Sequence, residues 1–333
     1  MKKILNQPDA YVDEMLAGLC AAHPRSYRLE GDDGRVIARA SGAVKGKVGI
    51  VTGGGSGHLP VFLGYVGDGL LDACAVGNVF AGPRVSDCQA AARAADGGAG
   101  VLQLYGNYGG DKMNFDMAQE FLELDGLEVS SVRVADDVAS APPPERDKRR
   151  GVAGMVYAFK IAGARAAEGG SLAEVTAAAT KAAQACRSIG IALTPCVVPE
   201  SGKPSFSIDD DEIEFGMGIH GEPGIWRGAM KPADALAQEM LDRLLPELDV
   251  GRGSRVAVLV NSLGATPHEE LYILYRHVAK VLGERGATPV MPLVGRYATS
   301  MEMAGASVTL MPLDAELERL LTARADCPFW RVG

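Results

Sequence analysis

The stretch that decides the fold is residues 47–58, which read Lys-Val-Gly-Ile-Val-Thr followed by Gly-Gly-Gly-Ser-Gly-His. Its first half, residues 47–52, is short, apolar and rich in β-branched residues, which predicts a buried β-strand. This strand runs directly into a glycine-rich segment, where backbone N–H groups can approach a bound oxygen without hindrance from Cβ atoms. Such a sequence is typical of the carboxyl edge of an α/β sheet, where ligands bind.

The same alternation of strand and helix continues on both sides of this stretch. Residues 9–22 predict a helix that stops before a His-Pro pair. Downstream, strands are predicted at residues 100–105 and 127–134, and helices at residues 85–95 and 113–124. This order predicts a largely parallel sheet that is covered by helices on both faces.

The second half of the chain shows the same kind of pattern. Further helices are expected at residues 152–167, 172–188, 231–245 and 267–282, and Thr266 is expected to cap the last of them. Further strands are expected at residues 204–206, 212–215, 256–260, 288–293 and 307–311. We therefore expect an α/β protein with two α/β domains, residues 1–188 and 189–333. Each domain should contain a mostly parallel or mixed sheet covered by helices.

Composition excludes several classes of protein. The 333 residues suit two domains of roughly 150 residues each. The net charge of -9 is spread along the chain, which argues against nucleic acid or an anionic membrane as the main partner. The six cysteines show no CxxC spacing, so neither a disulfide framework nor a zinc site is expected. Neither a signal peptide nor an apolar stretch of about 18 residues is present, which predicts a soluble cytoplasmic protein.

His58 and Asp111 are the first candidates for chemistry. The loop at residues 53–58 lacks the Gly-Lys-Ser/Thr of a phosphate loop, and His58 stands where a dinucleotide fingerprint needs glycine. Asp111 follows the strand at residues 100–105, so both side chains are expected at the carboxyl edge of one sheet, where they could form a proton-transfer pair. Two simpler interpretations stay open: the glycine segment could be only a tight turn, and Asp111 only the N-cap of the next helix.

His220 is the third candidate, because it lies in the glycine-rich segment at residues 215–224, Phe-Gly-Met-Gly-Ile-His-Gly-Glu-Pro-Gly. Glycines on both sides expose an imidazole and let a ligand approach it. His58, Asp111 and His220 could also form a metal-binding triad, but no HxH or HxxxH spacing supports it, and we expect no metal site. The other three histidines are interpreted as structural or solvated.

At this point the sequence resembles the substrate-binding subunit of dihydroxyacetone kinases. The similarity extends over almost the whole chain, in order. It is carried by GGGSGH (53–58), NYGGDKMNFDMA (107–118), RRGVAG (149–154), SIGIAL (188–193), GKPSF (202–206), FGMGIHGEPG (215–224) and NSLGATP (261–267).

The resemblance implies that His220 attacks the carbonyl carbon of a short ketose and forms a reversible hemiaminal. It implies that His58 and Asp111 act as acid/base partners, and that the backbone of the segment Gly55, Ser56 and Gly57 binds the ligand. Dihydroxyacetone-specific members of the family have lysine immediately before the Asn-Tyr pair, whereas this chain has Gly106. That difference leaves the three-carbon substrate in doubt and admits a four-carbon ketose such as erythrulose, or a branched one.

The resemblance also concerns partners. The chain is expected to bind no cofactor itself, because no nucleotide-binding helical domain follows within its 333 residues. A separate nucleotide-binding kinase subunit should carry ATP or ADP with magnesium, and the chain should form a homodimer. A second interpretation is a non-catalytic ketose sensor that serves gene regulation. A dinucleotide-dependent dehydrogenase is not supported, because its phosphate loop is missing.

Overall fold

The computed structural model describes residues 2–333 and contains two six-stranded mixed sheets. The first has the strand order β1-β2-β4-β3-β5-β6, in which β3, β4, β5 and β6 are parallel to one another and β2 pairs antiparallel with β1 and β4. Its strands are β1 (Tyr27–Glu30), β2 (Val36–Arg39), β3 (Gly49–Ser56), β4 (Ala73–Val79), β5 (Val101–Gly106) and β6 (Val129–Val134).

The second sheet has the order β11-β10-β12-β7-β8-β9, with β10 and β11 parallel and the other neighbours antiparallel. Its strands are β7 (Arg187–Thr194), β8 (Glu212–Phe215), β9 (Trp226–Ala229), β10 (Arg255–Ser262), β11 (Thr288–Gly295) and β12 (Ala304–Leu313). A two-stranded ribbon of β13 (Ala325–Cys327) and β14 (Trp330–Val332) follows. The prediction of two mixed α/β sheets is therefore confirmed.

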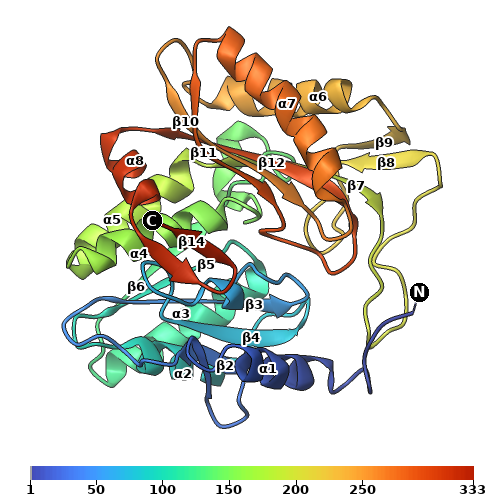
Figure 1. Ribbon diagram of the computed structural model, residues 1–333. Helices are drawn as coiled ribbons and strands as arrows, with labels where there is room; N and C mark the ends of the chain where they lie inside the picture. Colours follow the sequence, from blue (N-terminus) through green and yellow to red (C-terminus); the bar gives the residue numbers. More distant parts are fainter. Residues whose placement is uncertain (1) are drawn as a thin grey trace.

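Helices form layers around the two sheets (Figure 1). The helices are α1 (Tyr11–Ala22), α2 (Val85–Ala95), α3 (Gly109–Leu124), α4 (Met155–Ala167), α5 (Leu172–Ala185), α6 (Ala233–Leu244), α7 (His268–Glu284) and α8 (Ala315–Thr322), with short 3₁₀ turns at η1 (Leu63–Tyr65), η2 (Pro143–Lys148) and η3 (Leu245–Glu247). Helices α2 and α3 cover the outer face of the first sheet, and α6 and α7 cover the outer face of the second. None of the helices within residues 2–333 is long and apolar enough to cross a membrane.

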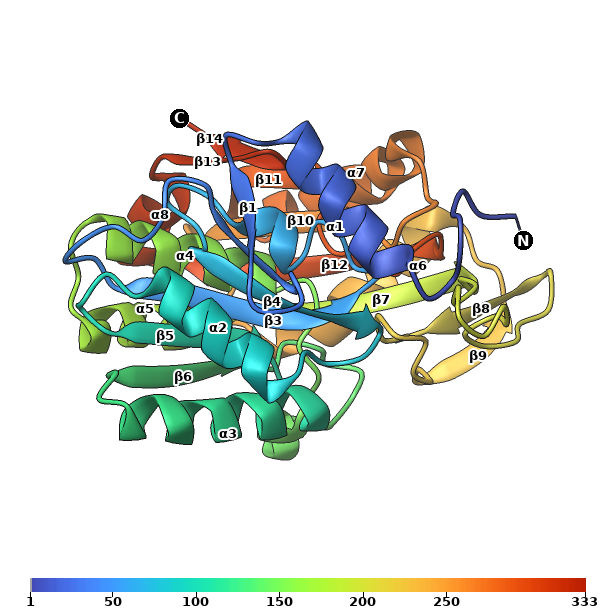
Figure 2. The ribbon, with the colours of Figure 1, turned by 90° about the horizontal axis from the view of Figure 1, so that it is seen from below.

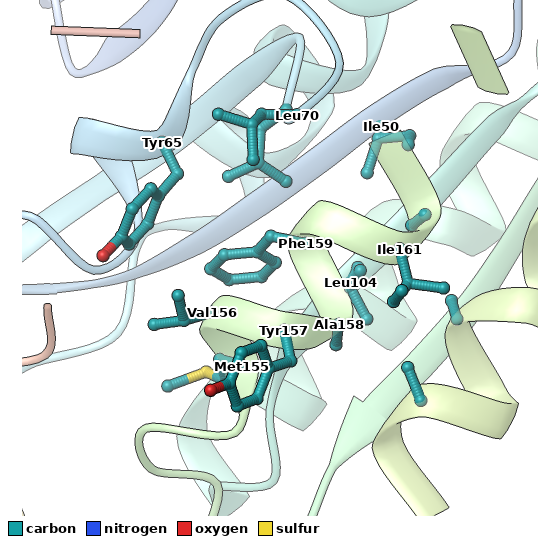
Figure 3. Close-up of a cluster of buried hydrophobic side chains, with 14 of the residues drawn as sticks. Ile50, Tyr65, Leu70, Leu104, Met155, Val156, Tyr157, Ala158, Phe159 and Ile161 are labelled. Carbon is teal, nitrogen blue, oxygen red and sulfur yellow. The ribbon is translucent and has the colours of Figure 1, made fainter. Parts of the chain in front are cut away.

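Helix α4 is buried on every side and lies between the two sheets. A helix that is apolar all round belongs inside a protein rather than on its surface. Figure 3 shows side chains of α4 surrounded by Tyr65, Leu70 and strand residues of the first sheet such as Ile50. The same apolar cluster includes Leu259 and Met311 of the second sheet, so both sheets pack into one continuous core.

Three predictions of local structure are wrong. The helix expected over residues 172–188 ends at Ala185, and the alternating residues from Arg187 onward form β7, with every second side chain meeting one face of the sheet. Residues 204–206 form no strand but contribute one isolated bridge, at Pro204. Thr266 does not cap α7, because its Oγ1 accepts a hydrogen bond from the N–H of Gly305 instead. The proposed boundary after residue 188 lies within β7, and the division into two domains stays a prediction.

Candidate active site

The site is assembled from loops of both sheets. His58 lies two residues after the end of β3, Asp111 lies in the first turn of α3, the helix that follows β5, and His220 lies between β8 and β9. The ring centroids of His58 and His220 are 4.7 Å apart in an edge-to-face arrangement. Asp111 lies close enough to His220 for the imidazole charge to lower the pKa of its carboxyl. The structure therefore brings the three candidate side chains together.

His58 is held as a neutral proton acceptor. Its Nδ1 lies 2.7 Å from the carbonyl oxygen of Thr299. Because a carbonyl can only accept, Nδ1 carries the hydrogen and Nε2 keeps its lone pair. Nε2 is buried and has no hydrogen-bond partner within the described residues. Burial, and secondarily the charge of His220, lower the pKa of His58 to about 3, although the bond to Thr299 opposes this.

Asp111 is a buried carboxylate with one free oxygen. Its Oδ1 has no hydrogen-bond partner in residues 2–333. This oxygen lies directly against Gly82, where an added Cβ would come within 2.5 Å of it. Burial raises the pKa of Asp111 to about 6, with the charge of His220 opposing the rise. The N-cap of α3 is Tyr108 rather than Asp111, so the interpretation of Asp111 as a helix cap is wrong.

His220 is oriented by Glu222, two residues further along the loop. One oxygen of Glu222 accepts from the His220 Nδ1–H at 2.9 Å, and the other accepts from the backbone N–H of His220 at 2.9 Å. Burial alone would raise the pKa of Glu222, but its bonds to His220 and the nearby Arg150 guanidinium lower it to about 2. The ionised carboxylate therefore holds the hydrogen on Nδ1, so that in the neutral imidazole the lone pair is on Nε2. The His220 side chain is 21% exposed, so a small ligand can reach it.

Two aromatic side chains complete the surroundings of the histidines. Phe80 stacks on His58 with ring centroids 4.9 Å apart, and the ring of Tyr108 meets His220 edge-to-face at 4.7 Å. The hydroxyl of Tyr108 is buried without a partner in the described part of the chain. Glu222 and Tyr108 lie inside motifs that the sequence singled out, but no role was predicted for them. Phe80 had no sequence signal, because only the tertiary structure places it against His58.

The glycine segment forms the end of β3 rather than a free loop. An added Cβ at Gly55 would lie 2.8 Å from Cα of Phe80, and one at Gly57 would lie 2.8 Å from the Phe80 ring. Both glycines thus let β3 pack closely against the turn that carries Phe80. The hydroxyl of Ser56 donates to the carbonyl oxygen of Gly77 at 2.8 Å. The carbonyl oxygen of Ser56 accepts from the N–H of Phe80 at 3.0 Å. A pocket of about 330 Å³ lies against Gly55, Ser56, Gly57 and His58, but neither Asp111 nor His220 lines it.

Gly106 is connected to the site through Tyr108. An added Cβ at Gly106 would lie 3.1 Å from the sulfur of Met155 and 3.3 Å from the Tyr108 ring. These two side chains line the space next to Gly106. Compared with lysine, glycine at this position therefore differs mainly by the missing ammonium and less by free volume.

The donor set fits acid/base chemistry and carbonyl capture. In their neutral forms, His58 and His220 each present the lone pair of Nε2, and Asp111 offers a buried carboxylate oxygen without a partner in the described residues. Among residues 2–333, no group of three or more histidine, cysteine, aspartate or glutamate side chains is arranged to hold a metal ion. The fold and site together define an α/β protein with two histidines and a buried carboxylate gathered between its two sheets.

Comparison with known proteins identifies the family. Residues 17–329 match the Dak1 domain. The chain is 44% identical over its full length, and that of the relative, to the dihydroxyacetone-binding subunit of the PTS-dependent dihydroxyacetone kinase 2 of Listeria innocua. It is 43% identical to the L-erythrulose kinase of Pectobacterium atrosepticum, covering all of this chain and 57% of that enzyme.

Solved structures show the same fold. The dihydroxyacetone kinase of C. freundii superposes with a TM-score of 0.90 at 32% identity, over 99% of this chain and 60% of that one. A dihydroxyacetone kinase operon co-activator superposes with a TM-score of 0.88 at 30% identity, over 96% of this chain and 98% of that one. The chain therefore belongs to the Dak1 family, and within it to the subunits of dihydroxyacetone- and erythrulose-type kinases.

Proposed function

We propose that this chain captures a short-chain ketose covalently on His220 and presents its terminal hydroxyl for phosphorylation. The observation that carries the proposal is the hydrogen bond from His220 Nδ1 to the ionised Glu222, which places the lone pair of the neutral imidazole on Nε2 of a partly exposed side chain. A neutral imidazole nitrogen is a competent nucleophile toward a carbonyl carbon.

In the capture step, Nε2 of His220 forms a bond to the carbonyl carbon, and the π electrons of the carbonyl move to its oxygen. That oxygen takes a proton from water and becomes a hydroxyl. The positive charge that develops on the imidazole ring is stabilised by the Glu222 carboxylate at Nδ1. The covalent bond holds the substrate in a fixed orientation and rejects polyols such as glycerol, which have no carbonyl.

In the transfer step, the terminal hydroxyl of the bound ketose attacks phosphorus and loses its proton. We assign Asp111 as the general base, because its buried Oδ1 has no partner in the described residues, the charge of His220 acts on it, and its pKa of about 6 leaves it ionised yet basic at neutral pH. His58 Nε2 accepts a hydrogen bond from a ligand hydroxyl, since its own proton is on Nδ1. The backbone of Gly55, Ser56 and Gly57 supplies further contacts.

The phosphoryl donor is assigned to a separate subunit that carries ATP, or ADP, with magnesium. The full-length match to a dihydroxyacetone-binding subunit of a PTS-dependent kinase supports this arrangement. Purified alone, the chain should therefore not transfer phosphate from ATP to a ketose. Robust ketose phosphorylation by the isolated chain with magnesium and ATP would contradict this assignment.

For the substrate, we propose that a four-carbon or branched ketose rivals dihydroxyacetone. Gly106 removes the lysine that precedes the Asn-Tyr pair in dihydroxyacetone-specific members. The similarity to L-erythrulose kinase is consistent with a larger ketose.

A second candidate function is ketose sensing without catalysis, which the similarity to an operon co-activator favours. The presence of His58, Asp111 and His220 in one site favours catalysis, because capture alone needs only His220.

The test is intact-mass spectrometry of the protein with dihydroxyacetone and erythrulose. The native protein should show a reversible adduct with the mass of the ketose, and His220→Ala should show none. His277→Ala, a histidine on α7 outside the site, is the matched control and should keep the adduct. An adduct that survives in His220→Ala overturns the proposal.

A further inference from the structure

A helix that covers one side of a sheet needs only one apolar face, but helix α3 has two. Its inner face, which includes Phe115, Ala118 and Leu122, packs into the core of the first sheet. Its outer face carries a second row of large apolar side chains at helical spacing. We call this row the α3 stripe: Met113, Met117, Phe121 and Leu124, exposed by 62%, 44%, 48% and 83%.

The α3 stripe lies on the outside of the molecule. Figure 2 shows α3 running along the outer side of the first sheet, beside the edge strand β6. Scattered exposed apolar residues are ordinary, but a continuous row of four on one helix face is typical of a surface that binds another protein.

The stripe begins near the amino-terminal end of α3, close to Asp111 along the chain but on the opposite face of the helix. Met113 lies two residues after Asp111, at the amino-terminal end of α3. Gly109 and Gly110 at this end are exposed, and an added Cβ on either would meet nothing within 4 Å. A partner bound along the stripe can therefore extend over the start of α3 toward Asp111 without a steric barrier.

Charge favours a partner of opposite sign. The exposed carboxylates of Asp116, Glu120 and Glu123 run alongside the stripe and outnumber the one exposed cation of this row, Lys112. A second copy would place an identical acidic row against this one, which disfavours self-association through this face of α3. It would also add bulk at the end of α3 where the phosphoryl donor has to enter.

A subunit that holds nucleotide phosphates and magnesium needs cationic groups around them. We propose that the α3 stripe is the docking surface for the nucleotide-binding subunit, with the stripe as its apolar core and the acidic row as its charged rim. This inference rests on the proposed function, because it assumes a separate phosphoryl donor.

The test uses the cognate nucleotide-binding subunit loaded with magnesium and ADP or ATP. In the double variant Met117→Glu/Phe121→Glu, its affinity for the chain should fall at least tenfold, as measured by calorimetry. Glutamate keeps the helix propensity of these exposed positions, so folding should persist. The matched control is Tyr272→Glu/Ile273→Glu, which changes two similarly exposed apolar residues on α7 and should leave the affinity unchanged.

The ketose adduct separates the two proposals. Met117→Glu/Phe121→Glu should keep the adduct mass and the thermal midpoint of the native protein. Glu120→Lys should weaken binding several-fold at low salt and less at high salt, because it removes a rim charge. If the double variant binds the subunit normally, or changes only self-association, the docking surface lies elsewhere and the inference is overturned. If the native chain forms no ketose adduct, or no nucleotide-binding subunit supports phosphorylation, the proposed function fails as well.

Discussion

The Glu222→Gln variant tests how the reactive nitrogen of His220 is prepared. In the native protein, two carboxylate oxygens accept from two donors, the backbone N–H and the Nδ1–H of His220. Glutamine has only one carbonyl oxygen, and its NH₂ group would face one of these donors. The mismatch is relieved when the backbone N–H keeps the oxygen and the imidazole moves its proton from Nδ1 to Nε2. That tautomer has no lone pair on Nε2 and cannot attack a ketone.

The expected effect follows from the hydrogen bond that changes. A hydrogen bond to a charged group contributes about 1.5–3 kcal/mol. Because 1.4 kcal/mol corresponds to a factor of ten, ketose capture should weaken by roughly 10- to 150-fold. The side chain of Glu222 is partly exposed, which places the expected value toward the lower end of that range.

The assay is a titration with dihydroxyacetone labelled with ¹³C at the carbonyl carbon, in which NMR distinguishes the ketone from the hemiaminal carbon. Long-range ¹⁵N spectra of the imidazole report the tautomer independently. Glu239→Gln changes a carboxylate that accepts from Trp226 and Lys231 outside the site, and it should leave capture unchanged. If Glu222→Gln binds the ketose as tightly as the native protein, Glu222 does not control the tautomer and the argument for Nε2 is refuted.

Three further outcomes are expected. With the nucleotide-binding subunit saturating, turnover should rise with pH through about 6 as Asp111 loses its proton. Asp111→Asn should lower turnover by roughly 10²-fold while ketose capture persists. Near-native turnover of this variant would show that Asp111 is not the base. Gly106→Lys should shift kcat/KM toward dihydroxyacetone relative to erythrulose, with Gly106→Ala as the control for size; a strong native preference for dihydroxyacetone would contradict the substrate assignment. Arg149→Met should lower the free energy of unfolding by about 3 kcal/mol, because Arg149 is buried and makes two bonds to Glu247, which then keeps only Arg187. An unchanged urea midpoint would show that this ion pair is not important for stability.

The positions of His58 and Asp111 at one sheet edge could be predicted from sequence. Local patterns of strand and helix place both after parallel strands, and the carboxyl ends of parallel strands meet at the same edge. By contrast, Thr266 fits a helix-cap pattern, yet its hydroxyl binds Gly305 in a distant strand. Local rules fail there because a backbone N–H brought close by tertiary packing competes for the same oxygen.

The sequence by itself determined the α/β class and the glycine segment at the end of β3, because periodicity and glycine spacing are local properties. It also singled out His58, Asp111 and His220 as candidates, and the family resemblance supplied their proposed roles. Only the tertiary structure decided how those side chains are tuned. The buried helix α4 holds the two sheets together, and this packing brings His220 against His58 and Tyr108. Burial lowers the pKa of His58 and raises that of Asp111, and it leaves His58 Nε2 and Asp111 Oδ1 without a hydrogen-bond partner in the described residues. Burial is a property of the whole fold, so no single motif could predict these pKa values.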